Sequence, residues 1–289
     1  MTATDVFVEH RNLLFTVAYE MLGSAADAED VLQETWLRWA DVDRAEVRDE
    51  RAYLVRISTR LALNRMRANA RRRESYVGPW LPEPLLTTPD VAEDVELADS
   101  VSLAMLTVLE TLGPTERAVF VLREVFEFGY DEIAVAVDKT PAAVRQIAHR
   151  ARAHVEERRP RGVPSQTEHE RAMQGFLTAV STGDIQSLMD VLAPDVVLIT
   201  DGGGVKKAAL RPILGREKVA RFLDAVTRGV DAAADVVVVN GSPALRIVVD
   251  GELESVASMV VEDGLVTGLY VVRNPAKLAR LDAVVTLTR

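Results

Sequence analysis

Hydrophobic residues recur every three or four positions through most of the first 160 residues, a spacing typical of amphipathic helices. The pattern predicts helices over residues 5–22 and 25–40. Gly23 ends the first helix, and Ser24 is a suitable N-cap for the second. Trp36 and Trp39 fall with the apolar positions of the second helix, so we interpret them as core residues.

The next helical stretch, residues 51–73, contains eight arginines and no lysine, aspartate or glutamate. Its apolar positions lie at or near helical steps: Leu54, Ile57, Leu61, Leu63 and Met66. A basic helix face over these 23 residues can contact several phosphates along a nucleic-acid backbone. Arginine suits bidentate contacts with phosphate or base edges. The stretch favours nucleic-acid binding. A solvated charged face and a basic helix lying on an anionic membrane are the alternatives.

Residues 76–90 contain four prolines, which predict an extended linker. Trp80, Leu81 and Leu85 are too apolar for a solvated linker, so we expect them to dock on a neighbouring surface.

Helices are then predicted over residues 101–112, 114–128 and 131–137, followed by a longer one that begins at Pro141. A short helix, a three-residue turn and a long basic helix form a helix-turn-helix, in which the second helix enters the DNA major groove. Thr140 caps the long helix, and its polar side carries Arg145, Gln146, His149, Arg150 and Arg152. The alternative is an ordinary helical hairpin.

Beyond residue 168 the pattern changes. Helices are predicted over residues 168–181, 185–192 and 216–226, among β-rich runs at 196–200, 236–239, 245–249, 255–261 and 266–272. Glycine, asparagine, proline or aspartate separates these runs, which predicts an antiparallel sheet. The fold class is therefore multidomain: two all-α modules followed by an α+β domain. The predicted bounds are 1–75, a linker at 76–100, 101–160, a linker at 161–167, and 168–289.

The charge of the 289-residue chain is uneven. It totals −10, but residues 1–50 carry −8 and residues 51–73 carry +8. An acidic surface beside a basic one suggests two partners, of which one is a basic protein. The chain has no cysteine and its four histidines lack zinc spacing, so we expect no disulfide, metal site or cofactor. No apolar run approaches the length of a membrane span and no signal peptide is evident, so we expect a cytoplasmic protein.

Two motifs carry a family resemblance. Asp27–Arg38 (DAEDVLQETWLR) is similar to region two of extracytoplasmic-function (group IV) RNA polymerase sigma factors, and Leu109–Glu157 resembles their region four. The resemblance implies two partners, core RNA polymerase (β′ and β subunits) and promoter DNA. It places polymerase binding on Asp27, Asp30, Gln33 and Glu34. It places −10 binding on Tyr53, Arg60, Asn64, Arg65, Arg67 and Arg71. It places −35 binding on Thr140, Arg145, Gln146, His149, Arg150 and Arg152.

The last third resembles the SnoaL-like domain, a cone-shaped fold of the nuclear-transport-factor (NTF2-like) type that is fused to one subgroup of these sigma factors. Three motifs carry this match: WLPEPL at Trp80–Leu85, DGGG at Asp201–Gly204 and NPAKL at Asn274–Leu278. The subgroup's DGGG is usually followed directly by lysine, whereas here Val205 intervenes before Lys206. The resemblance implies that this domain replaces a separate anti-sigma protein by packing on region two and the linker. The expected contacts are Trp80, Leu81, Pro82, Glu83, Asp201, Gly202, Gly203, Gly204, Lys206, Asn274, Pro275 and Lys277.

Asp201 beside three glycines also fits a general base on a loop, so a SnoaL-like enzyme is one alternative, and a ligand-sensing helix-turn-helix repressor is another. We favour an intramolecular contact, with no catalytic residue, and leave open an unidentified small ligand. A repressor is usually a symmetric dimer, whereas two unlike modules suit two unlike promoter elements. We therefore expect the free chain to be a monomer that acts as an alternative sigma factor.

Overall fold

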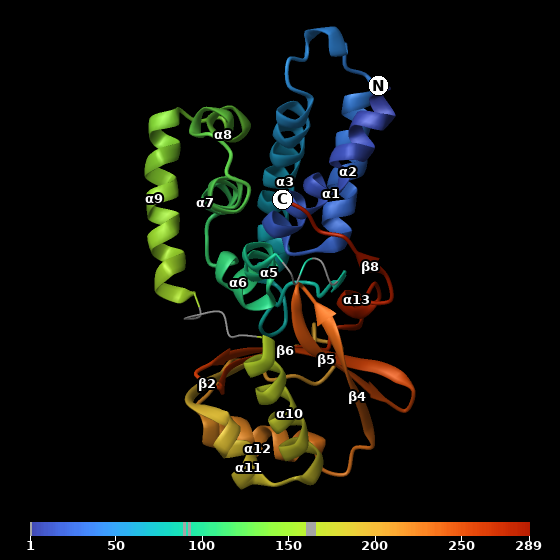
Figure 1. The fold of residues 1–289 in the computed structure, drawn as a ribbon, viewed down its shortest axis with the longest axis vertical. Helices are drawn as coiled ribbons and strands as arrows, with labels where there is room; N and C mark the ends of the chain where they lie inside the picture. The colour runs from blue at the N-terminus through green and yellow to red at the C-terminus, as the bar shows by residue number, and fades with distance from the viewer. Residues whose placement is uncertain (1, 89–90, 92–93, 160–165) are drawn as a thin grey trace.

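The computed structural model describes residues 2–88, 91, 94–159 and 166–289. Three parts are visible in Figure 1. The first helices stand upright, a second helical group lies beside them, and a curved sheet with its own helices lies beneath both. No helix among the described residues has the length and apolar character needed to cross a membrane.

The first part consists of three α-helices and one short 3₁₀ helix: α1 (Ala3–Leu22), α2 (Ala25–Ala40), η1 (Arg44–Glu46) and α3 (Glu50–Glu74). Thr2 and Asp5 form a capping box at the start of α1. Gly23 adopts a left-handed conformation that ends α1, and the Ser24 side chain then accepts from the Asp27 amide to start α2. Trp39 is fully buried in the core, as predicted, and Trp36 is partly buried against it.

The second part runs from α5 to α9: α5 (Val95–Val101), α6 (Leu103–Leu109), α7 (Pro114–Phe120), a π-helical turn η2 (Val121–Val125), α8 (Tyr130–Val137) and α9 (Pro141–Arg158). The prediction of one helix over residues 101–112 is wrong, because Ser102 leaves the helical conformation and caps α6 through the Met105 amide. The prediction of a single α-helix over residues 114–128 is also wrong, since it changes to π-helix after Phe120.

The third part contains most of the strands: α10 (Gln166–Thr182), α11 (Ile185–Val191), β2 (Leu192–Asp201), β3 (Ile213–Leu214), α12 (Arg216–Thr227), β4 (Ala232–Val239), β5 (Ser242–Val249), β6 (Glu252–Glu262), β7 (Leu265–Val272), α13 (Pro275–Leu278) and β8 (Val284–Val285). The sheet order is β3-β2-β7-β6-β5-β4-β1-β8. The prediction of a purely antiparallel sheet is wrong, because β2 runs parallel to β7. These strands are far apart in sequence, so no hairpin fixes their relative direction.

The linker between the helical parts contributes strand β1 (Leu86–Thr87) to this sheet. It pairs antiparallel with β4 and parallel with β8, so it lies between two strands of the third part. The extended linker predicted from the prolines is thus built into the third domain's sheet.

Both faces of the sheet pack against other elements, although much of β4 is exposed. Helices α10–α12 cover one face around a core that includes Leu198, Leu245 and Leu269. The other face packs against the linker, α6 and α13, through Leu81, Leu103 and Leu278. The two helical parts share one continuous core, which also receives Leu287 from the C-terminal tail.

Candidate nucleic-acid interface and interdomain junction

Helix α3 presents the arginine-rich face. Asp49 caps its start through the Ala52 amide, and Leu54, Leu61 and Leu63 bury the other face. Ile57 and Met66 are partly buried against the same core. A helix of 25 residues spans roughly 37 Å, so the basic face is long enough for several phosphates.

The residues assigned to the −10 element have different surroundings. Tyr53 is partly buried, with its ring 5.8 Å from that of Trp39. Asn64 and Arg67 are exposed. Arg60 donates to the backbone oxygens of Val135 (2.8 Å) and Ala136 (3.4 Å) in α8. The side chain of Arg71 lies outside the described residues.

Arg65 faces the acidic residues assigned to polymerase binding. Its guanidinium pairs with Asp27 at 3.1 Å and also with Asp30. Gln33 and Glu34 are exposed further along α2. Part of the acidic surface is therefore neutralised within the chain.

The helix-turn-helix forms at α8 and α9. Asp138 ends α8 in a left-handed conformation, and the Thr140 hydroxyl accepts from the Ala143 amide to cap α9. Arg152 makes two hydrogen bonds with Glu124, at 3.0 and 2.7 Å, so it braces η2 against α9. The other four assigned residues are exposed and line a surface hollow of about 340 Å³: Arg145, Gln146, His149 and Arg150.

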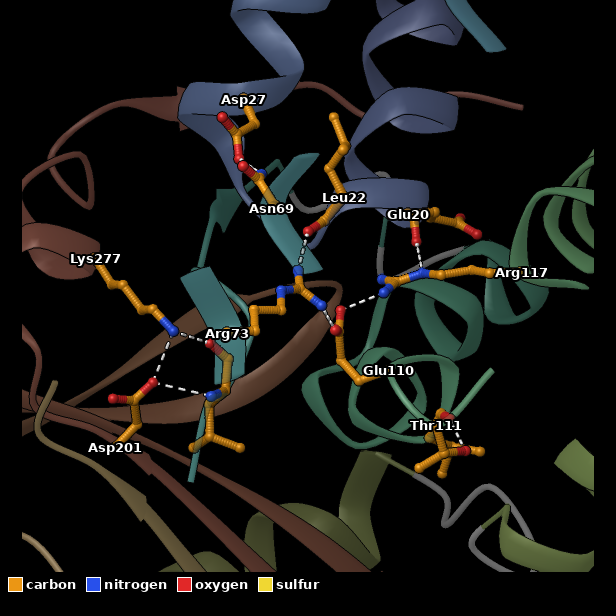
Figure 2. Close-up of polar contacts among 12 residues, drawn as sticks. Glu20, Leu22, Asp27, Asn69, Arg73, Glu110, Thr111, Arg117, Asp201 and Lys277 are labelled. Carbon is orange, nitrogen blue, oxygen red and sulfur yellow. Dashed lines mark hydrogen bonds and ion pairs between the residues drawn. The ribbon is translucent and has the colours of Figure 1, made fainter. Parts of the chain in front are cut away.

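A buried charge network joins the two helical parts (Figure 2). Glu110, just after α6, pairs with both Arg73 of α3 and Arg117 of α7. Arg117 is buried and donates from Nε to the backbone oxygen of Glu20 in α1, at 2.7 Å. Burial lowers the pKa of Arg117 to about 9 and raises the pKa of Glu20 to about 8.

Asp201 ends β2 at the centre of the junction between the sheet and the linker. Its carboxylate is fully buried and accepts from the Tyr76 hydroxyl (2.6 Å), the Leu81 amide (2.9 Å) and the Gly203 amide (3.0 Å). Lys277 of α13 pairs with it at 2.7 Å and also donates to the Leu81 backbone oxygen, as Figure 2 shows. Burial lowers the pKa of Lys277 to about 8, although the Asp201 charge opposes that shift.

The Trp80 ring lies between the helical part and α13. The Lys277 ammonium is 3.9 Å from its centroid and the Arg73 guanidinium carbon is 4.0 Å away. Pro82 is buried. Glu83 accepts from the Ser24 hydroxyl and the Ala25 amide, so a linker carboxylate caps the positive end of α2.

The glycines of DGGG are required by close packing. A Cβ on Gly203 would lie 2.3 Å from the Asn274 amide nitrogen, and one on Gly202 would lie 2.1 Å from the Lys206 backbone oxygen. Gly204 lies against Val77 of the linker. Asn274 caps α13 and donates to the Tyr76 hydroxyl at 2.7 Å.

The remaining motif residues lie outside this cluster. The Lys206 side chain pairs with Glu254 at 2.6 Å and is 40% exposed. Val205 and Pro275 are exposed. It is therefore Lys277, and not Lys206, that supplies the cation beside Asp201.

The junction contains a solvent-open pocket of about 280 Å³. Both helical and third-domain residues line it, among them Asp27, Arg73, Tyr76, Trp80 and Lys277. Each charged side chain in this group has a partner within the chain. Because these charges are already paired, the lining favours neither an anionic nor a cationic ligand.

Several residues of the junction were not identified from the sequence. In the sequence, Glu20 and Arg117 stand at ordinary helix positions, so nothing marks them as junction residues. Asn240 and Gly241 form the turn between β4 and β5, and the sequence marked them only as a turn. The Asn240 side chain is fully buried and contacts the linker, α1 and α5.

Comparisons with known proteins agree with this architecture. Residues 6–72 match Sigma-70 region 2, and residues 102–155 match Sigma-70, region 4. The chain is 35% identical to the ECF RNA polymerase sigma factor SigJ of Mycobacterium tuberculosis, over 92% of this chain and 90% of SigJ. It is 32% identical to the probable ECF RNA polymerase sigma factor SigI of the same species, over 95% of this chain and 94% of SigI.

The crystal structure of M. tuberculosis SigJ superposes with a TM-score of 0.78, covering 96% of this chain and 99% of SigJ. The third part is accordingly an NTF2-like, SnoaL-like domain. Family membership implies that the chain binds core RNA polymerase and promoter DNA during transcription initiation. The chain belongs to the extracytoplasmic-function RNA polymerase sigma factors that carry a C-terminal SnoaL-like domain.

Proposed function

We propose that this alternative sigma factor rests in a closed form, in which its SnoaL-like domain holds regions two and four together in place of an anti-sigma protein. The observation that carries the proposal is the contact between α3 and α8. Arg60, assigned to the −10 element, donates instead to the Val135 and Ala136 backbone oxygens. Arg51 also lies over the Phe128 ring, at 4.7 Å.

The dimensions of promoter DNA support this proposal. Elements centred near −10 and −35 are about 25 base pairs apart, or roughly 80 Å along B-DNA. Helix α8 packs on α3 and α9 packs on α8, so α9 lies within about two interhelical distances, roughly 20 Å, of α3. The two reading helices must separate by tens of ångströms before both elements are bound.

The domain is well placed to oppose that separation. Asp201 and Lys277 hold the linker backbone at Leu81, and β1 is paired within the sheet. We propose no enzymatic role for Asp201, because its carboxylate is fully buried and paired with Lys277. When polymerase binds, Asp27 and Asp30 would exchange Arg65 for basic groups of the polymerase.

A reversible lock tests the proposal. The chain has no cysteine, so Arg60→Cys and Val135→Cys can be joined specifically by a short bis-maleimide with a cleavable disulfide spacer. We expect the linked chain to lose promoter-directed transcription with core RNA polymerase and to regain it after reduction. The unlinked double variant controls for loss of the Arg60 side chain. Equal transcription by linked and reduced protein would refute the closed resting form.

A second comparison tests whether the SnoaL-like domain raises or lowers transcription. Full-length chain and a chain ending at Gln166 are assayed with core polymerase on DNA from upstream of the gene. We expect deletion to change transcript yield without changing the promoter selected. Identical yields would remove the regulatory role of the domain, even if the lock experiment succeeds.

A further inference from the structure

Three hairpin turns of the sheet share one backbone geometry. They are Asn240–Gly241, Asp250–Gly251 and Asp263–Gly264, and both residues of each turn have positive φ, as a type I′ turn requires. A Cβ added at Gly251 or Gly264 would meet no atom within 4 Å. A Cβ at Gly241 would lie 2.7 Å from Ala98 Cα. The Asn240–Gly241 turn is therefore inserted against the sigma modules, whereas Gly251 and Gly264 of the other two turns have free space around them.

Asn240 uses its backbone amide, its side-chain oxygen and its side-chain nitrogen at the inserted turn. Its backbone amide donates to the Leu85 oxygen, and its side-chain oxygen accepts from the Leu85 amide, each at 2.9 Å. Its side-chain nitrogen donates to the Tyr19 hydroxyl at 2.7 Å and to the Val101 backbone oxygen at 2.8 Å. One fully buried side chain thus joins the linker, α1 of region two and the end of α5.

The partners explain why this turn has asparagine where the other two have aspartate. The Val101 oxygen can only accept, and the Leu85 amide can only donate, so they fix the amide orientation without ambiguity. A carboxylate has no donor for Val101 and would be buried facing a carbonyl dipole. An aspartate would keep the turn but lose this contact.

The Asn240 contacts differ from those of the Asp201 cluster. Asp201 and Lys277 bond to the linker, which is continuous with region two. Asn240 reaches Val101, directly before the capping residue Ser102 and the start of α6. Among the described residues, Arg289 at the chain's end also forms ion pairs with Glu96 of α5 and with Asp94, the N-cap of α5.

We propose that Asn240 is a positioning residue that sets where region four sits relative to region two. The proposal rests on the proposed function, since it names one polar contact by which the domain holds the closed form. Opening breaks the bond between the Asn240 amide and Val101, while the linker stays in the sheet. Asn240 acts through Tyr19 and Val101 and does not itself contact DNA.

The test measures the distance between the modules in the full-length protein. Leu37→Cys on α2 and Lys139→Cys before α9 are exposed positions for a fluorescent donor and acceptor in this cysteine-free chain. We expect high-transfer molecules to predominate in the parent, with a small low-transfer fraction. Asn240→Asp should raise the ratio of low- to high-transfer molecules about tenfold or more, because it leaves the Val101 oxygen without a donor. Asp250→Asn, the reverse change at an exposed turn, is the matched control and should leave the ratio unchanged.

A second variant separates positioning from folding. Asn240→Gly keeps the left-handed backbone without strain and removes only the side chain, so it should also raise the low-transfer population, with an unchanged circular dichroism spectrum. This variant decides the question if Asn240→Asp does not fold.

Parent-like transfer in both variants would overturn the role of Asn240. If Lys277→Met shifts the transfer while the Asn240 variants do not, this inference fails and the closed-state proposal stands. If the cleavable lock has no effect on transcription, the proposed function itself fails.

Discussion

Lys277 and Lys206 offer a direct test of how a buried ion pair supports the junction. We consider Lys277→Met, which keeps the length of the apolar stem and removes the ammonium. Asp201 would then be a fully buried carboxylate without its cation. Breaking a buried pair on one side costs about 3–5 kcal/mol, and the three remaining hydrogen bonds to Asp201 place the cost near the lower end, at about 3 kcal/mol.

That cost corresponds to a fall in melting temperature of roughly 5–10 °C for a chain of this size. The measurement is thermal unfolding of full-length protein followed by circular dichroism. Lys206→Met is the matched control, because the Lys206–Glu254 pair is partly exposed and worth less than about 1 kcal/mol. The double variant Asp201→Asn with Lys277→Met removes both charges and should recover part of the loss. Similar shifts for Lys277→Met and Lys206→Met would refute the reasoning.

Three further changes are expected to act at separate points. Burial raises the pKa of Glu20 from 4.5 to about 8, so its contribution to stability is full below about pH 4.5 and is lost as the pH rises towards 8. The melting temperature of Glu20→Gln relative to the parent should therefore increase between pH 5 and pH 8, and a constant difference would contradict this. Gly203→Ala places a Cβ against Asn274 and should lower the melting temperature far more than Gly264→Ala, which adds only left-handed strain of about 1 kcal/mol. Leu287→Ala should lower the free energy of unfolding by about 2–3 kcal/mol, because this tail residue is buried in the core shared by regions two and four. Thermal unfolding measures the change, and a loss below about 1 kcal/mol would show that the tail does not stabilise the core.

Local spacing was enough to predict the helices of the first module and helices α8 and α9 of the second. The buried positions Leu54, Leu61 and Leu63 of α3 follow from periodicity alone. The cap at Thr140 follows from residue type, since a threonine stands directly before Pro141. The break at Ser102 was missed because the apolar pattern continues through it, while the serine side chain competes for the Met105 amide. Tertiary packing then selects between one helix and two.

The junction depends on residues that are distant in sequence. Tyr76, Leu81, Asp201 and Lys277 meet only after the sheet has formed, and periodicity contains no information on such pairs. Resemblance to a family singled out three of these residues but did not indicate the geometry. Asn240 shows the limit most clearly, since an asparagine–glycine turn has the same sequence signal whether its side chain is solvated or buried.

Strand β1 has a consequence for the order of events during synthesis. Leu86 leaves the ribosome well before its partner Val239 and about 200 residues before Val284, which at 5–20 residues per second is roughly 10–40 s. Between the synthesis of Arg158 and that of Val239, an interval of about 80 residues, regions two and four can be complete while β1 has no neighbouring strand. Each new molecule therefore passes through a period as a two-module chain without its sheet domain, and a polymerase encountered during translation would meet that chain first.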